Sequence, residues 1–133
     1  MVVGVVLGFP PWLAAALLYG DGSQERDFTF VEDIARGALA ALQRIGFQVI
    51  NLGSNRPVAL MEVINVLQGM LGRETEICQE PMPETDVMST WADVSQAWDL
   101  LRWEPTTTLE AGLRATVDWY VQQAEWVKEV KTT

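Results

Sequence analysis

The sequence predicts a helix-rich α/β domain, α+β-like in its irregular order, with about four helices and three or four short strands. Its 133 residues are enough for one domain with its own core. Hydrophobic residues make up 49% of the chain, which excludes a disordered protein. Segments with helical spacing alternate with short apolar runs, too irregularly for a complete doubly wound sheet.

Residues 1–18 form an apolar segment without a charged side chain. A membrane span needs about 20 uninterrupted apolar residues, and Pro10-Pro11 interrupts this segment. A signal peptide would open with a positively charged region, which is missing. We therefore expect a buried strand at Val2–Leu7 and a short helix from Trp12 to Leu18, covered by this domain's core or by another subunit.

The next elements follow from turn residues and apolar spacing. A turn is expected at Gly20–Ser23. A helix then begins near Glu32 and is ended by Gly46. An apolar strand is expected at Phe47–Leu52. The apolar positions of that helix are Ile34, Ala38, Ala41, Leu42 and Ile45.

A second helix is expected up to Gly72, its C′ residue, followed by a strand at Glu74–Gln79 and an irregular connection at Glu80–Met88. Asp93 is the expected N-cap of a third helix, which ends at Trp103-Glu104-Pro105. The inner faces of these helices comprise Leu60, Val63, Ile64, Leu67, Met70 and Leu71, then Val94, Ala97, Trp98 and Leu101.

Thr107-Thr108-Leu109-Glu110 predicts a capping box at the start of a last helix, which runs to about Lys131. Its expected inner face comprises Leu109, Leu113, Val117, Tyr120, Val121 and Ala124.

Composition excludes several function classes. A net charge of −9 argues against nucleic-acid and anionic-membrane partners, which need a basic footprint. The absence of histidine excludes His-based catalysis and nearly all zinc sites. Cys78 is the only cysteine, so no internal disulfide forms, and we expect an inert buried thiol in a cytoplasmic protein. The tryptophans at 91, 98, 103, 119 and 126 are interpreted as core and rim packing.

From Leu18 to Thr133 the chain resembles the C-terminal part of extended short-chain dehydrogenase/reductases that act on nucleotide sugars, most of all the UDP-glucuronate 4-epimerases. The tail also resembles that of the dTDP-glucose 4,6-dehydratases. The resemblance rests on a series of short sequence strings. Each string alone is weak evidence for the family, but the whole set in this order is specific to it. The strings are Tyr19-Gly20-Asp21-Gly22, Arg26-Asp27-Phe28-Thr29-Phe30-Val31-Glu32-Asp33, Ile50-Asn51-Leu52-Gly53-Ser54-Asn55-Arg56-Pro57-Val58, Asp86-Val87, Thr90-Trp91-Ala92-Asp93, Trp103-Glu104-Pro105, Leu109-Glu110-Ala111-Gly112-Leu113 and Thr116-Val117-Asp118-Trp119-Tyr120.

The resemblance implies half of a two-lobed enzyme. It divides the chain into an unmatched segment 1–18 and a nucleotide-sugar-binding lobe 19–133. Family enzymes hold NAD with a GxxGxxG loop and use a catalytic YxxxK pair. This sequence contains neither, because Tyr19 and Tyr120 are followed four residues later by Ser23 and Ala124. We therefore expect no catalytic residue and no bound NAD in this chain, only a partial lobe of the family fold.

The resemblance places a phosphate contact at Arg26 and the uracil side of the pocket at Tyr19. An arginine fork suits two phosphate oxygens at once. Two interpretations of Arg26 stay open: a phosphate ligand, or a surface pair with Glu25 or Asp27. Tyr19 is either a pocket wall or an aromatic packed on the core.

Three further contacts are implied. Asp86 corresponds to an acid beside the ribose, Thr90 to the pocket wall, and Arg56 to a further anion contact. The alternatives are a solvated loop acid, an ordinary strand threonine and an exposed loop charge. Pro83 departs from the family, where Arg, Gln or His is common. This loss of a donor predicts weak affinity.

Three functions remain open. One is a UDP-sugar-binding lobe, truncated or excised, that works with a Rossmann-domain partner in trans. Another is a non-catalytic interaction or structural protein, in which the apolar surface recruits a second copy; we expect a homodimer or higher oligomer. The last is a folded fragment that binds nothing.

Overall fold

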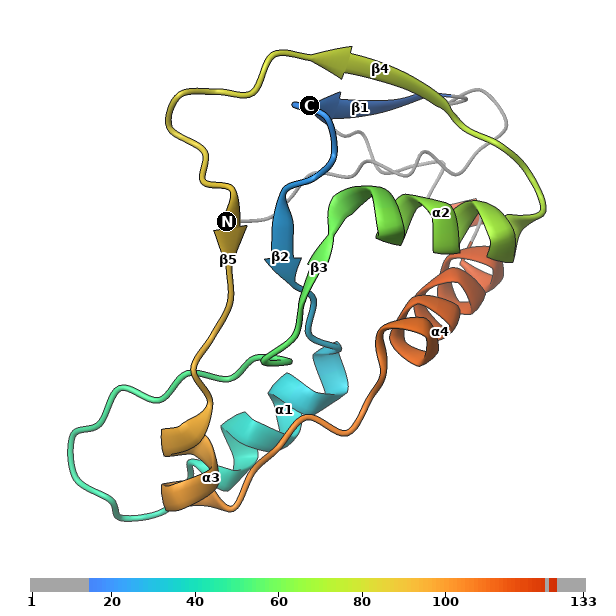
Figure 1. Ribbon diagram of the computed structural model, residues 1–133. Helices are drawn as coiled ribbons and strands as arrows, with labels where there is room; N and C mark the ends of the chain where they lie inside the picture. The colour runs from blue at the N-terminus through green and yellow to red at the C-terminus, as the bar shows by residue number, and fades with distance from the viewer. Residues whose placement is uncertain (1–14, 124, 127–133) are drawn as a thin grey trace.

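The computed structural model describes residues 15–123 and 125–126, and that part of the chain holds five short strands and four helices (Figure 1). This confirms the predicted helix-rich α/β class. In chain order they are β1 (Ala15–Tyr19), β2 (Glu25–Asp27), α1 (Val31–Ala40), β3 (Pro57–Ala59), α2 (Leu60–Leu71), β4 (Glu76–Glu80), β5 (Ser89–Thr90), α3 (Ser95–Leu101) and α4 (Leu109–Gln122). No helix among the described residues is long and apolar enough to cross a membrane.

The strands form two small sheets. β1 pairs in parallel with β4. In the other sheet β2 lies in the middle, antiparallel to β3 and parallel to β5. In the β2–β5 register Arg26 lies opposite Thr90. Figure 1 shows β3, β2 and β5 side by side, with α1 and α3 at their lower end and α2 beside β3. The ends of β2 and β5 next to α1 therefore meet at one place.

Helix α2 lies at the centre of the core. Leu60 and Ile64 pack on Leu18 of β1, whereas Val63 and Leu67 pack on Val117 of α4. These positions follow the spacing expected of an amphipathic helix, so the prediction is confirmed. Gly72 ends the helix with a left-handed φ of 64°, the conformation that favours glycine.

A further core cluster joins α1 to α3. Ala97, Leu101 and Trp103 are buried there. The indole N–H of Trp103 donates to the carbonyl oxygen of Asp33 at 2.9 Å. Gly37 permits this approach, because a Cβ there would lie 3.0 Å from the indole nitrogen of Trp103. Arg102 ends α3 with a left-handed φ of 52°.

The predicted start of the last helix is one residue early. Thr108 is the N-cap of α4, and its side chain accepts from the amide of Ala111. Glu110 is therefore not the third helical residue, and the capping box expected from Thr107 is wrong.

The helix expected from Trp12 to Leu18 is wrong where the structure describes it, because residues 15–19 form β1. Ala16 and Leu18 are buried, whereas Leu17 and Tyr19 are about half exposed. This alternation is that of a strand, and pairing with β4 supplies its backbone hydrogen bonds. The strand expected at Val2–Leu7 lies outside the described residues.

The strand expected at Phe47–Leu52 is also wrong, and α1 ends at Ala40 rather than near Gly46. No described strand pairs with 47–52, and Phe47 is 94% exposed. Only Ile45, Ile50 and Leu52 of this region pack against the Trp103 cluster.

Several predictions of burial are wrong as well. Cys78 is exposed on β4 rather than buried. Trp98, Tyr120 and Val121 are exposed rather than inward-facing. Of the tryptophans interpreted as core and rim packing, Trp103 lies in the core, and the others are about half exposed.

Candidate functional site

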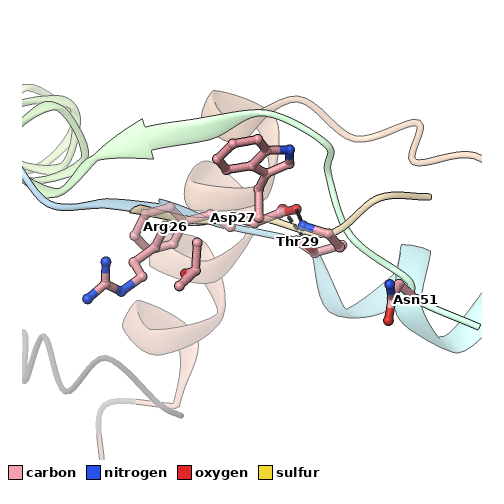
Figure 2. A pocket seen from close by; sticks show the side chains of 8 residues that line it. Arg26, Asp27, Thr29 and Asn51 are labelled. Atoms are coloured by element: carbon pink, nitrogen blue, oxygen red, sulfur yellow. Dashed lines mark hydrogen bonds between the residues drawn. The ribbon is translucent and has the colours of Figure 1, made fainter. Parts of the chain in front are cut away.

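A pocket of about 540 Å³ lies where the adjacent ends of β2 and β5 meet the segment after α1. Its size suits a small organic ligand. Figure 2 shows Arg26 at one end, Asn51 at the other, and Asp27 with Thr29 between them. The lining residues are Arg26, Asp27, Phe28, Thr29, Asn51, Thr90, Trp91 and Ala92.

Arg26 is a buried cation in the wall of this pocket, with only 7% of its surface exposed. Its Nη2 lies 2.6 Å from Oδ1 of Asp86, and its Nη1 donates to the carbonyl oxygen of Glu25 at 2.8 Å. Its Nε is buried and has no hydrogen-bond partner. The alternative of a surface pair with the side chain of Glu25 or Asp27 is therefore wrong.

Asp27 connects three segments of the chain through its carboxylate. Oδ1 accepts from the amide of Ser54 at 2.6 Å, and Oδ2 accepts from the amides of Asn55 and Ala92 at 3.2 and 3.1 Å. The hydroxyl of Thr29 also donates to Oδ1. The adjacent turn and the strand β5 are thereby fixed relative to β2, which determines the shape of the pocket.

Two opposing effects act on the pKa of Asp27. Burial raises this pKa, whereas hydrogen bonds from Ser54, Ala92 and Thr29 lower it. The hydrogen bonds outweigh burial, so the pKa lies below the ordinary value and the carboxylate stays ionised at neutral pH.

The structure brings three of the five sequence-predicted site residues together. Arg26 and Thr90 line the pocket, and Asp86 pairs with Arg26. Asp86 is thus a partly buried ion-pair partner, not a solvated loop acid. Tyr19 and Arg56 do not line this pocket, and both are exposed.

Sequence reasoning did not propose Asp27, Asn51 or Trp91 as site residues, although all three line the pocket. All three lie within the strings that carry the family resemblance. Nothing in those strings alone shows that Asp27 holds two distant backbone segments.

The described residues do not fit NAD, the cofactor that the resemblance implies for the family. A dinucleotide site needs a glycine-rich turn between a strand and a helix. The described strand-to-helix connections, at 28–30 and 91–94 and directly between Ala59 and Leu60, contain no glycine. Within the described residues there is also no group of three acidic or cysteine side chains that could hold a metal ion.

Comparison with known proteins gives the family. The sequence model described as GDP-mannose 4,6 dehydratase matches residues 13–116. UDP-glucuronate 4-epimerase from Thermodesulfobacterium geofontis is 40% identical over 115 residues, covering 86% of this chain and 36% of the relative. The chain thus spans about a third of the length of this curated relative.

Solved structures show the same relationship. UDP-glucuronic acid 4-epimerase from Bacillus cereus, in complex with UDP-glucuronic acid and NAD, matches with a TM-score of 0.75 and 33% identity over 81% of this chain and 35% of its own. dTDP-glucose 4,6-dehydratase from Bacillus anthracis matches with a TM-score of 0.78 and 28% identity over 88% of this chain and 38% of its own. These matches confirm the resemblance to the C-terminal part of extended short-chain dehydrogenase/reductases, and the chain belongs to the GDP-mannose 4,6-dehydratase family.

Proposed function

We propose that this chain is the nucleotide-sugar-binding part of an epimerase or dehydratase and that its pocket holds the diphosphate of a UDP-sugar. One observation carries the proposal: Arg26 is buried in the pocket wall, and its Nε lacks an acceptor. A buried N–H without a partner is rare in folded proteins, and a phosphate oxygen would satisfy it once the atoms that cover Nε move aside.

The other lining residues fit the same ligand. Thr29, Asn51 and Thr90 carry hydroxyl and amide groups that suit sugar hydroxyls. Phe28 and Trp91 offer aromatic surface for a base or a sugar ring. The Bacillus cereus relative binds UDP-glucuronic acid in its crystal structure, which supports this ligand class. The affinity for this ligand is expected to be weak for two reasons. The chain has a net charge of −9, and Pro83 stands at a position where the family commonly has a hydrogen-bond donor.

Replacing Arg26 with Gln is expected to weaken UDP binding roughly 10- to 100-fold, because a charge-assisted hydrogen bond is lost. Isothermal titration with UDP and UDP-glucuronate measures the loss, and NAD serves as the ligand that should give no heat. Arg56→Gln is the matched control: it removes the same charge from an exposed side chain outside the pocket.

Thermal unfolding of both variants shows whether they are folded, and Arg26→Lys provides a second test because it keeps the charge without the fork. The absence of both binding heat and thermal stabilisation at millimolar UDP would contradict the proposal. Equal losses in the Arg26 and Arg56 variants would contradict the role of Arg26.

A second function, self-association as a homodimer or larger oligomer without catalysis, is favoured by a separate observation. Four apolar side chains within an eleven-residue stretch are 69–94% exposed, namely Leu39, Leu42, Phe47 and Val49. Exposed apolar side chains this close in the sequence favour an interaction surface. A Rossmann-domain partner in trans is the alternative occupant under the first proposal.

Phe47→Ser is expected to reduce any self-association at least tenfold, because Phe47 is the most exposed of these side chains. Sedimentation velocity over a range of concentrations measures the change. Arg26→Gln should leave the association unchanged. A wild-type chain that stays monomeric at high concentration would contradict self-association.

A further inference from the structure

The ion pair between Arg26 and Asp86 leaves the arginine fork half filled. Nη2 contacts one carboxylate oxygen of Asp86 at 2.6 Å, while the adjacent Nε has no acceptor. Nη1 faces backbone carbonyl oxygens of Glu25 and Met88 instead. A fork-to-fork pair would use two carboxylate oxygens on two nitrogens, so Asp86 is an incomplete ligand for this guanidinium.

Asp86 is held in this position by its own loop. The same Oδ1 accepts from the amide of Val87 at 2.9 Å, and the amide of Asp86 donates to the carbonyl oxygen of Pro83 at 3.0 Å. Oδ1 is therefore shared between a backbone amide and Arg26. The side chain of Asp86 is 22% exposed, whereas that of Arg26 is 9% exposed. Asp86 can turn toward solvent at less cost than Arg26 can leave the wall.

We propose that Asp86 is a built-in competitor at the Arg26 site and that it sets which anions the pocket accepts. This inference rests on the proposed function. An anion that reaches Arg26 must displace the carboxylate of Asp86, which carries one negative charge, or share the guanidinium with it. A diphosphate offers more charge and two oxygens that can span Nε and Nη2, and it completes the fork once Asp86 and the atoms that cover Nε move aside. A monocarboxylate offers no gain over Asp86 and is excluded.

The competition lowers the apparent affinity for every anion, because only the fraction of molecules with a released Arg26 binds. Once released, the carboxylate of Asp86 is free to accept from hydroxyl groups. It can regain part of its lost interaction with UDP, which has a ribose, but not with inorganic pyrophosphate. The effect of removing the Asp86 charge should therefore be larger for pyrophosphate than for UDP.

Asp86→Asn tests this directly in the full chain, because it keeps the size of the side chain and an oxygen for the Val87 amide. Calorimetric titration with pyrophosphate is expected to show about tenfold tighter binding than in the wild type, with a smaller gain for UDP. Acetate, which the wild type is expected to exclude, should bind Asp86→Asn measurably. Glu84→Gln is the control, since it removes one negative charge from an exposed side chain of the same loop.

The outcomes separate this inference from the proposed function. One outcome is that the wild type binds UDP but Asp86→Asn weakens pyrophosphate and UDP binding alike. Asp86 would then hold Arg26 in position for the ligand, and the claim that Asp86 competes with anions would be overturned, while the proposed function stands. Equal gains in Asp86→Asn and Glu84→Gln would reduce the effect to net charge and would also overturn it. If no form of the chain binds UDP or pyrophosphate, both proposals fail.

A measurement on the wild type keeps the inference testable if Asp86→Asn does not fold. The carboxyl carbon of Asp86 and the Nε–H of Arg26 are followed by NMR during titration with pyrophosphate. Both resonances are expected to shift with the same midpoint, because one contact is exchanged for the other. A shift at Nε–H without a shift at the Asp86 carboxyl carbon would overturn the exchange.

Discussion

Asp33→Ala is expected to lower the free energy of unfolding by roughly 2–5 kcal/mol, because several partly buried hydrogen bonds to its buried carboxylate are lost. The side chain of Asp33 is 2% exposed. Its Oδ1 accepts from the amide and the hydroxyl of Thr106 at 3.3 and 3.0 Å, and its Oδ2 accepts from the amide of Thr107 at 3.0 Å. These bonds join the first turn of α1 to the segment before α4. Urea denaturation measures the loss.

The same contacts predict how stability depends on pH. Burial raises the pKa of Asp33, but hydrogen bonds from Arg36, Thr107 and Thr106 lower it by more than burial raises it. The pKa in the folded state therefore lies far below the ordinary 3.8. A depressed carboxyl pKa contributes stability that is present above the unfolded pKa and is lost as the pH falls below it. Stability should therefore fall between about pH 5 and pH 2, with a shallower slope in Asp33→Asn.

Two variants control for simpler explanations. Glu32→Gln removes an exposed acid from the same first turn of α1 and should change stability by less than about 0.5 kcal/mol. Arg36→Gln should cost under about 1 kcal/mol, because its side chain is 47% exposed and the Thr106 and Thr107 bonds remain. A loss in Glu32→Gln equal to that in Asp33→Ala would show that charge near the helix end, not the hydrogen bonds, stabilises the fold.

Sequence patterns predicted the elements that carry their own signal. The α2 helix has a complete apolar stripe and a terminal glycine, and the structure places both as expected. The segments 15–19 and 47–52 lack such a signal, because short apolar runs suit a strand or a helix equally. The presence of a pairing strand determines which structure forms: β1 pairs with β4, whereas no described strand pairs with 47–52.

The sequence predicted those residues of the candidate site to which the family resemblance assigns a role. Arg26, Asp86 and Thr90 were expected from the resemblance, and the structure brings them together at one pocket. The role of Asp27 could not be read from the chain, because its hydrogen-bond partners at Ser54 and Ala92 lie 27 and 65 residues away. Such long-range contacts depend on the packing of the whole domain.

Gly53→Ala is expected to destabilise the domain by about 2–4 kcal/mol and to abolish UDP binding. A Cβ at Gly53 would lie 2.6 Å from Oδ2 of Asp27 and 2.6 Å from the Cβ of Ala92. Neither neighbour can easily yield, since the Asp27 carboxylate is held by the amides of Ser54 and Asn55 as well as that of Ala92. The φ of Gly53 is not left-handed, so space alone is the constraint.

The new methyl group must therefore push the carboxylate away from these amides or push β5 away from β2. Either movement opens the pocket wall that carries Arg26 and Thr90. Gly69→Ala is the matched control: nothing lies within 4 Å of a Cβ there, and alanine in the last turn of α2 should stabilise the domain by up to about 1 kcal/mol. Urea denaturation and UDP calorimetry on both variants separate the two sites. A Gly53→Ala protein with wild-type stability and wild-type UDP affinity would contradict the view that Asp27, Gly53 and Ala92 are packed without room to yield, and with it the rigid pocket on which the diphosphate site depends.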